Sequence, residues 1–163
     1  MGLEPRSGYQ ALVEAPFPEP HCLLGIRVAD RSLIGIDYLF SQEKPLAPRT
    51  SLAALVVKQL QGYFADPGYR FHLPIQVRGT PFQRRVWAAL REIPPGKTRT
   101  YGALAAALES SPRAVGNACR ANPLPLVVPC HRVVSVSGLG GYDGRTAGRN
   151  ISIKRWLLDH EAA

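Results

Sequence analysis

Residues 101–120 read YGALAAALESSPRAVGNACR, and this stretch decides the architecture of the second half of the chain. The pattern predicts one short helix over 101–108 and another over 112–120. A serine of the intervening turn suits the N-cap of the second helix, and Pro112 suits its first position. Two short helices with a tight turn are typical of a helix-turn-helix, although such pairs also occur in ordinary helical proteins.

The second of these helices has a face that does not look like a packing surface. That face carries residues at positions i, i+3, i+4 and i+7, namely Arg113, Gly116, Asn117 and Arg120. A glycine between two arginines would let a nucleic-acid backbone approach closely, so we predict that this face binds DNA. The opposite face is apolar, and Cys119 on it is predicted to be a small core residue.

The charge of the chain is concentrated in its second half. Residues 1–78 hold 8 basic and 7 acidic side chains, whereas residues 79–163 hold 12 and 5. A basic half beside a nearly neutral one suggests that the basic half meets a polyanion. A surface tuned for solubility would explain the same charge equally well.

Composition narrows the class of protein. The chain has 163 residues, 45% of them hydrophobic and 20% charged, which predicts a folded soluble protein. No apolar run is long enough to span a bilayer, and the first residues contain no signal-peptide core. The three cysteines show no metal spacing and fit free thiols in a reducing compartment. We therefore expect a cytoplasmic protein.

The first half reads as a small α/β unit. Strands are predicted over 23–28 and 32–39 around an Ala-Asp-Arg turn, followed by a helix from about 51 to 64. The apolar stripe of this helix is expected to comprise Leu52, Leu55, Val56, Leu60 and Phe64. The second half begins at Gly79, where Thr80 can cap a further helix that ends before residue 94. The expected domains are therefore residues 1–78 and 79–163.

The reactive groups of the sequence lie in VVPCHRVV at 127–134. Valines on both sides predict a buried strand, yet its centre holds Cys130, His131 and Arg132. Positive charge favours the thiolate form of a cysteine, so these neighbours indicate a nucleophile rather than simple packing. Successive side chains of a strand point to opposite faces. His131 can therefore serve the thiol only if the chain turns sharply or a water relays the proton.

Two charged residues of the last helix, predicted over about 153–160, extend this constellation. Glu161 continues the apolar stripe of that helix and could orient His131, as nucleophilic triads require. A solvated terminal acid is the alternative, because glutamates are seldom buried. Lys154 lies on a similar face, and solvent exposure is the alternative for it too.

Together these motifs resemble one family. GTPFQRRVW, the Tyr-Gly pair at 101, SPRAVGNACRANP, VVPCHRVV, GGYDG and KRWLLDHE are similar to segments of the O6-alkylguanine-DNA alkyltransferases, over about residues 79–163. The resemblance implies an α/β N-terminal domain with a ribonuclease H-like sheet. It also implies a mostly helical C-terminal domain of winged helix-turn-helix type.

The resemblance implies direct-reversal repair of DNA, in which a methyl or other alkyl group passes from O6-alkylguanine to the protein and is not released. A similar reaction on O4-alkylthymine is an open extension. Carried over by motif, Cys130 is the nucleophile, His131 is the base acting through a water, and Glu161 orients His131. Tyr101 helps to extrude the damaged nucleotide and donates a proton toward the departing guanine.

The remaining roles also follow from the resemblance. Asn122 is the hinge asparagine between the recognition helix and the active-site segment, and the Val133 carbonyl accepts from the guanine amino group. The Asp143 N–H lies near the O6 oxygen, Tyr142 lines the pocket wall and Lys154 lies at its edge.

The implied partner is double-stranded DNA carrying O6-alkylguanine and bound through the minor groove. Arg113 fills the space left by the flipped base, with Gly116, Asn117 and Arg120 on the same DNA-binding face. We expect a monomer with no cofactor, no metal and no membrane partner. Three alternatives stay open: a lesion sensor without catalysis, a cysteine hydrolase, and a winged-helix DNA binder in which Cys130 only packs.

Overall fold

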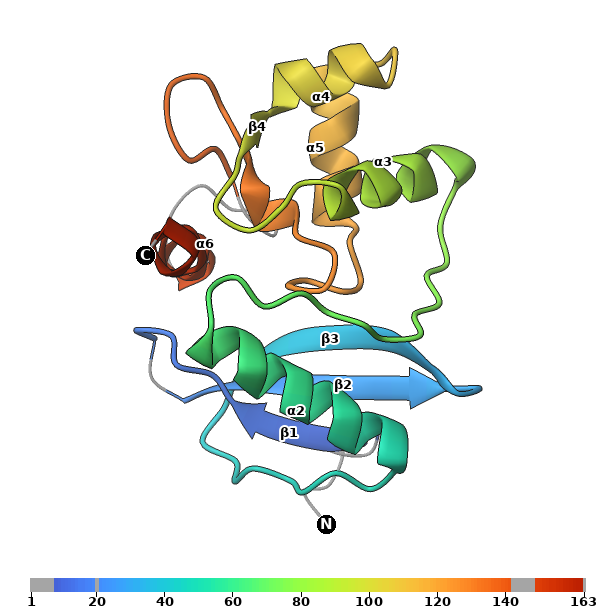
Figure 1. Cartoon of the computed structure of the whole chain (residues 1–163), viewed down its shortest axis with the longest axis vertical. Helices are drawn as coiled ribbons and strands as arrows, with labels where there is room; N and C mark the ends of the chain where they lie inside the picture. Colours follow the sequence, from blue (N-terminus) through green and yellow to red (C-terminus); the bar gives the residue numbers. More distant parts are fainter. Residues whose placement is uncertain (1–7, 20, 142–148, 163) are drawn as a thin grey trace. The chain divides into compact units, whose positions relative to one another are not determined.

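The computed structural model describes residues 8–19, 21–141 and 149–162. The chain folds as two compact units, Met1–Val77 and Arg78–Ala163. Figure 1 shows the elements of each unit. Among the described residues, no helix is both long and apolar enough to cross a membrane.

Unit 1 is a small antiparallel sheet with one helix packed against it. Its strands are β1 (Ala11–Glu14), β2 (Cys22–Ala29) and β3 (Ser32–Phe40), hydrogen-bonded in the order β1-β2-β3. The predicted strands and turn are confirmed: Asp30 and Arg31 connect β2 to β3 with φ of 49° and 65°. Two positive φ values give a turn whose twist matches that of the strands it joins.

Helix α2 (Ser51–Ala65) begins where it was predicted, and the Thr50 side chain caps it by accepting from the N–H of Ala53. The helix contacts all three strands. The predicted apolar stripe is partly wrong, since Leu55 is 40% exposed while Ala53 and Tyr63 are buried. The face of α2 that packs on the sheet is therefore rotated about the helix axis relative to the predicted apolar stripe.

Unit 2 begins with α3 (Pro81–Arg91), whose start is fixed by a reciprocal capping box between Thr80 and Gln83. Next come β4 (Arg99–Thr100), which was not predicted, and the helices α4 (Tyr101–Ala107) and α5 (Pro112–Arg120), which were. The Trp87 indole donates to the Ala118 carbonyl at 2.8 Å and so joins α3 to α5.

The rest of unit 2 carries the reactive residues. It comprises the short 3₁₀ helix η1 (Cys130–Arg132), the strand β5 (Val133–Val134), which pairs parallel to β4, and the helix α6 (Arg149–Ala162). The prediction of a mostly helical domain is wrong. The stretches 121–129 and 135–141 contain no helix, because three prolines lie in the first and five residues of the second are glycine or serine.

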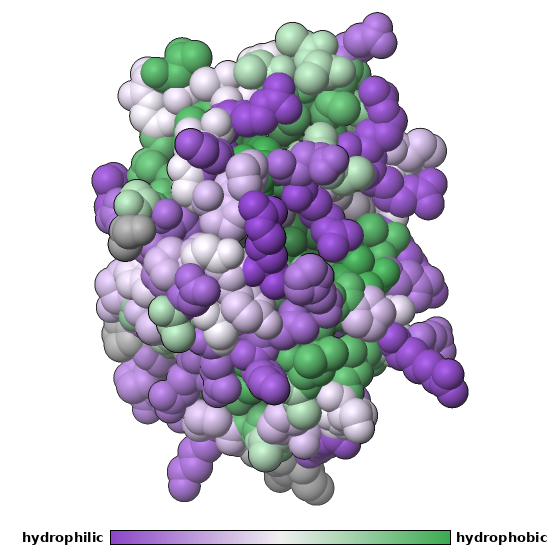
Figure 2. Space-filling view, viewed as in Figure 1, coloured by the Kyte–Doolittle hydropathy of each residue, from purple (hydrophilic) through white to green (hydrophobic). Residues whose placement is uncertain are grey.

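Side chains on the surface follow the usual mixture. On the face drawn in Figure 2, hydrophilic residues are interspersed with hydrophobic ones, which is ordinary for folded domains. Leu55 and Val136 are the large hydrophobic residues exposed among those described, and Val136 is 91% exposed in the loop after β5.

Candidate active site

The segment VVPCHRVV is a turn rather than a strand. Only Val133 and Val134 are extended, whereas residues 130–132 form η1, in which the Arg132 N–H donates to the Pro129 carbonyl at 3.0 Å. The predicted buried strand is therefore wrong over most of its length. Pro129 lacks the N–H that a strand ladder needs, and the two-residue strand β4 offers little to pair with. The sharp turn is one of the two ways in which His131 could serve the neighbouring thiol.

His131 is completely buried and is held by the last helix. Its Nε2 lies 2.8 Å from the Glu161 Oε2, whereas its Nδ1 has no hydrogen-bond partner among the described residues. Burial lowers the pKa of the imidazole, and the positive charges of Arg132 and Lys154 lower it further. Hydrogen bonding to Glu161 acts in the opposite direction without reversing that outcome. A neutral imidazole that donates from Nε2 has its lone pair on Nδ1, which is the state a general base requires.

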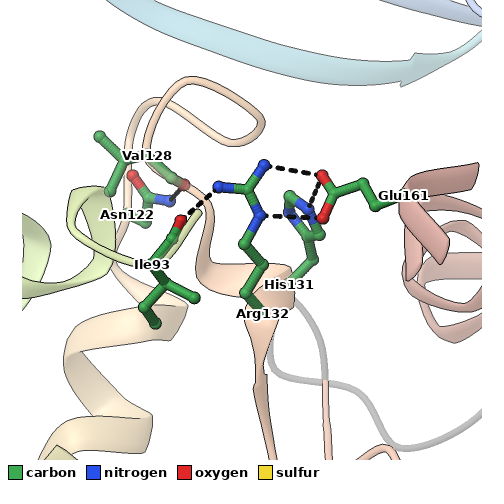
Figure 3. Close-up of polar contacts among 6 residues, drawn as sticks. All are labelled: Ile93, Asn122, Val128, His131, Arg132 and Glu161. Atoms are coloured by element: carbon green, nitrogen blue, oxygen red, sulfur yellow. Dashed lines mark hydrogen bonds and ion pairs between the residues drawn. The ribbon is translucent and has the colours of Figure 1, made fainter. Parts of the chain in front are cut away.

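Glu161 is buried, so the alternative of a solvated terminal acid is wrong. The residue is 6% exposed and its carboxylate faces η1 from α6. Figure 3 shows the reason for its burial: the guanidinium of Arg132 pairs with both carboxylate oxygens, at 2.9 and 2.8 Å. A charged carboxylate tolerates burial when it is paired and fully hydrogen-bonded.

Lys154 is also buried rather than solvated. Its Nζ donates to the carbonyls of Val133 and Gly141 at 2.7 and 2.8 Å, and it lies 5.7 Å from the centre of the Tyr101 ring. Burial lowers the pKa of this lysine from 10.5 to about 8. The lysine thus ties the glycine-rich loop to β5 beside the reactive turn.

Tyr101 stands at the start of α4 with its hydroxyl near the same loop. The hydroxyl donates to the Gly141 carbonyl across 3.3 Å, a long hydrogen bond. Burial, followed by the proximity of Cys119 and Cys130, raises the pKa of this phenol well above its usual value. Tyr101 therefore stays protonated at neutral pH, as an ordinary phenol does, and its hydroxyl serves as a hydrogen-bond donor.

Asn122 fastens the loop between α5 and η1. Its Nδ2 donates to the Val128 carbonyl at 2.8 Å, and its Oδ1 accepts from the Leu124 N–H at 2.9 Å. The amide thus links the segment that follows α5 to the segment that enters the reactive turn (Figure 3). The hinge role that the family resemblance implies for Asn122 stays a prediction.

The predicted DNA-binding face of α5 is open. Arg113, Asn117 and Arg120 are exposed, and a Cβ added at Gly116 would meet no atom within 4 Å. On the opposite side Val115 and Ala118 are buried. Cys119 is less buried than those two residues, but burial raises the pKa of its thiol to about 12. Cys119 is therefore a protonated and weakly nucleophilic thiol at neutral pH.

Three further residues were expected to contribute to the substrate pocket, namely Tyr142, Asp143 and Val133. Tyr142 and Asp143 lie outside the described residues. The Val133 carbonyl, which the resemblance assigns to the guanine amino group, accepts from Lys154 Nζ at 2.7 Å in this structure. Among the residues described, no three His, Cys, Asp or Glu side chains are grouped so as to hold a metal ion.

The contacts that Arg132 makes were not predicted from the sequence. Its guanidinium bridges the Glu161 carboxylate and the Ile93 carbonyl, which accepts from Nη1 at 2.6 Å. The only signal in the sequence was a charged residue within a segment that begins and ends with valines. Such a residue is buried only with a partner, and the partner is 29 residues away.

Comparison with known proteins agrees with this geometry. The family model described as "6-O-methylguanine DNA methyltransferase, DNA binding domain" matches residues 81–163. The methylated-DNA–protein-cysteine methyltransferase of Sulfolobus acidocaldarius is 33% identical over 150 residues, which cover 92% of this chain and 93% of that protein. The chain belongs to the methylated-DNA–protein-cysteine methyltransferase family. The predicted family and enzyme class, and DNA as the partner of that family's domain, are therefore confirmed.

Other methyltransferases of the family agree with this assignment. The constitutive enzyme of Bacillus subtilis is 49% identical over 107 residues, which cover 64% of this chain and 62% of that protein. The crystal structure of Mycobacterium tuberculosis OGT in complex with DNA superposes with a TM-score of 0.75 at 34% identity. That superposition covers 93% of this chain and 91% of the other. The similarity thus includes both units of the chain.

Proposed function

We propose that this chain repairs O6-alkylguanine in double-stranded DNA by moving the alkyl group onto Cys130 in a single turnover. The observation that carries the proposal is the buried series Cys130, His131 and Glu161, in which the carboxylate lies 2.8 Å from His131 Nε2 and leaves Nδ1 as the base. Cys130 precedes that base directly in η1, on the family's matched segment.

The chemistry balances without a cofactor. The Cys130 proton passes to His131 Nδ1 through a water, and the sulfur attacks the carbon attached to guanine O6. An S–C bond forms as the C–O6 bond breaks, and the electron pair of that bond leaves with guanine. The Tyr101 hydroxyl supplies a proton to guanine, and both side chains then exchange protons with solvent. A thioether is a very poor leaving group, so the protein is consumed.

The DNA-binding part of the proposal concerns α4 and α5, which we interpret as a helix-turn-helix of winged type. The exposed face of α5 enters the minor groove, with Arg113 filling the space of the extruded nucleotide. A mispaired damaged base costs less to extrude than an intact pair, which favours lesions. The basic second half of the chain supplies attraction to phosphates that does not depend on sequence.

Several finer expectations belong to the same proposal. They are the domain division into residues 1–78 and 79–163, a ribonuclease H-like first domain, a monomeric state, a cytoplasmic location, and the pocket roles of Asn122, Val133, Tyr142, Asp143 and Lys154. Activity on O4-alkylthymine would extend the substrate range.

The test compares three cysteine variants on a duplex that contains one O6-methylguanine. Cys130→Ser should lose methyl transfer and still bind the duplex, whereas Cys22→Ser and Cys119→Ser should keep transfer. Repeated turnover without DNA would favour a cysteine hydrolase. Tight lesion binding without any transfer by the wild type would favour a sensor or a plain DNA binder.

A further inference from the structure

The guanidinium of Arg132 is buried at the junction of three segments of unit 2. It donates to the Ile93 carbonyl after α3 and to both oxygens of Glu161 on α6, while its own backbone belongs to η1 (Figure 3). The residue is 6% exposed. Its planar fork matches the carboxylate in a way that a lysine could not.

The ion pair between Arg132 and Glu161 fixes the orientation of the Glu161 carboxylate. Glu161 Oε1 accepts from Arg132 Nε, and Oε2 accepts from Arg132 Nη2 as well as lying 2.8 Å from His131 Nε2. With two points held, the carboxylate plane cannot rotate away from the imidazole. Glu161 Oε2 is shared between Arg132 Nη2 and His131 Nε2. The position of His131 therefore depends on the Arg132 guanidinium, which fixes the carboxylate.

The ion pair between Arg132 and Glu161 also determines the charge of His131. In the described structure, Glu161 and Lys154 face this imidazole from α6, and Cys130 and Arg132 flank it in η1. Arg132 already neutralises the carboxylate, so an imidazolium beside it would be an extra buried positive charge. Without Arg132, the carboxylate and an imidazolium would form the neutral pair instead. The imidazole would then carry a proton on Nδ1, the nitrogen that must be unprotonated to act as the base.

We propose that Arg132 is a positioning residue of the alkyl-transfer reaction: its fork fixes Glu161 and keeps His131 as the neutral imidazole protonated on Nε2. This inference rests on the proposed function for its kinetic consequences. The protonation state of His131 can be measured without any substrate, so the two proposals can fail separately.

The first measurement uses the wild-type protein and ¹⁵N NMR of its histidine rings at pH 7. The His131 signals should show one protonated ring nitrogen, Nε2, and one unprotonated nitrogen, Nδ1. An imidazolium, or a neutral ring protonated on Nδ1, would overturn the inference even if methyl transfer were normal. A protein with the expected ring state but no transfer would overturn the proposed function and leave the role of Arg132 in place.

The second measurement compares Arg132→Met and Arg132→Lys in single-turnover methyl transfer between pH 6 and 9. Arg132→Met should react roughly tenfold or more slowly than wild type at pH 7, with the midpoint of its pH profile moved to higher pH and an imidazolium at His131. Arg132→Lys keeps the charge but loses the fork, so its ring should stay neutral while its rate falls.

Arg85→Met is the matched control, because Arg85 is an exposed arginine of the same unit whose hydrogen bond goes to the Leu108 carbonyl rather than to Glu161 or Ile93. Its rate and pH profile should match those of wild type. If Arg132→Met does not fold, as judged by circular dichroism, the Arg132→Lys comparison decides. A lysine variant as fast as wild type with an unchanged pH profile would overturn the positioning role.

Discussion

The buried Lys154 gives the sharpest thermodynamic prediction. Its Nζ is enclosed by β5, the glycine-rich loop and the Tyr101 ring, and its pKa is lowered from 10.5 to about 8. Between those pH values an unfolded chain carries a proton on this lysine that the folded chain lacks. Stability therefore rises with pH across this window, because the unfolded state binds more protons. Below pH 8 the lysine is protonated in both the folded and the unfolded chain, so it makes no pH-dependent contribution to the free energy of unfolding.

The magnitude follows from the difference between the two pKa values. Each pH unit within the window is equivalent to about 1.4 kcal/mol, so the lysine should contribute roughly 3 kcal/mol between pH 8 and 10.5. A neutral amine still has two N–H groups for the carbonyls of Val133 and Gly141, so deprotonation does not break those hydrogen bonds.

The assay is urea unfolding of wild type and Lys154→Met at half-unit steps from pH 7 to 10.5. The other titrating groups largely cancel in the difference between the two free energies of unfolding. That difference should shift by about 3 kcal/mol in favour of wild type as the pH rises through the window. Lys97→Met, at an exposed lysine of the same unit, is the matched control. A flat difference for Lys154→Met would refute the reasoning, since it would mean that burial does not perturb this amine.

Three further predictions concern packing, backbone and DNA. Trp87→Phe should lower the free energy of unfolding by about 1–3 kcal/mol, because it leaves the buried Ala118 carbonyl without its indole donor; an unchanged urea midpoint would contradict this. Gly96→Ala should destabilise by about 1–2 kcal/mol, since its φ is +84° and a Cβ would lie 3.2 Å from the Glu161 carbonyl. Gly102→Ala, where a Cβ meets nothing, should be neutral or stabilising in the same denaturation assay. Arg113→Ala should slow repair of duplex DNA more than reaction with free O6-methylguanine, and equal losses on both substrates would remove the base-extrusion role from Arg113.

The elements that sequence reasoning located correctly are those with local signals. Thr50, Thr80 and Ser111 each accept from a backbone N–H of the first turn, and each begins a helix where the sequence predicts one. A capping side chain and the backbone N–H that it binds are three residues apart, so the start of such a helix can be predicted without tertiary information. The rotation of α2, which exposes Leu55, depends on the shape of the sheet and was not available from periodicity.

The reactive turn shows where local reasoning stops. Cys130 and His131 were identified because their residue types carry chemistry, but the 3₁₀ geometry of η1 was not predicted. Pro129 disfavours a strand locally, but the contacts that hold the turn come from far along the chain, above all from the Glu161 carboxylate that pairs with both His131 and Arg132. Glutamates and lysines are usually exposed, so the burial of Glu161 and Lys154 could be recognised only once those partners were in place.

The central claim is that Cys130 accepts one alkyl group and is then spent. The most direct measurement mixes the protein with an excess of duplex that carries one labelled O6-methylguanine, counts the methyl groups lost per protein molecule, and locates the label by peptide mass analysis. One methyl group per chain, found on the peptide that contains Cys130, is the predicted result. Several methyl groups removed per chain, or a label on Cys22 or Cys119 alone, would contradict it.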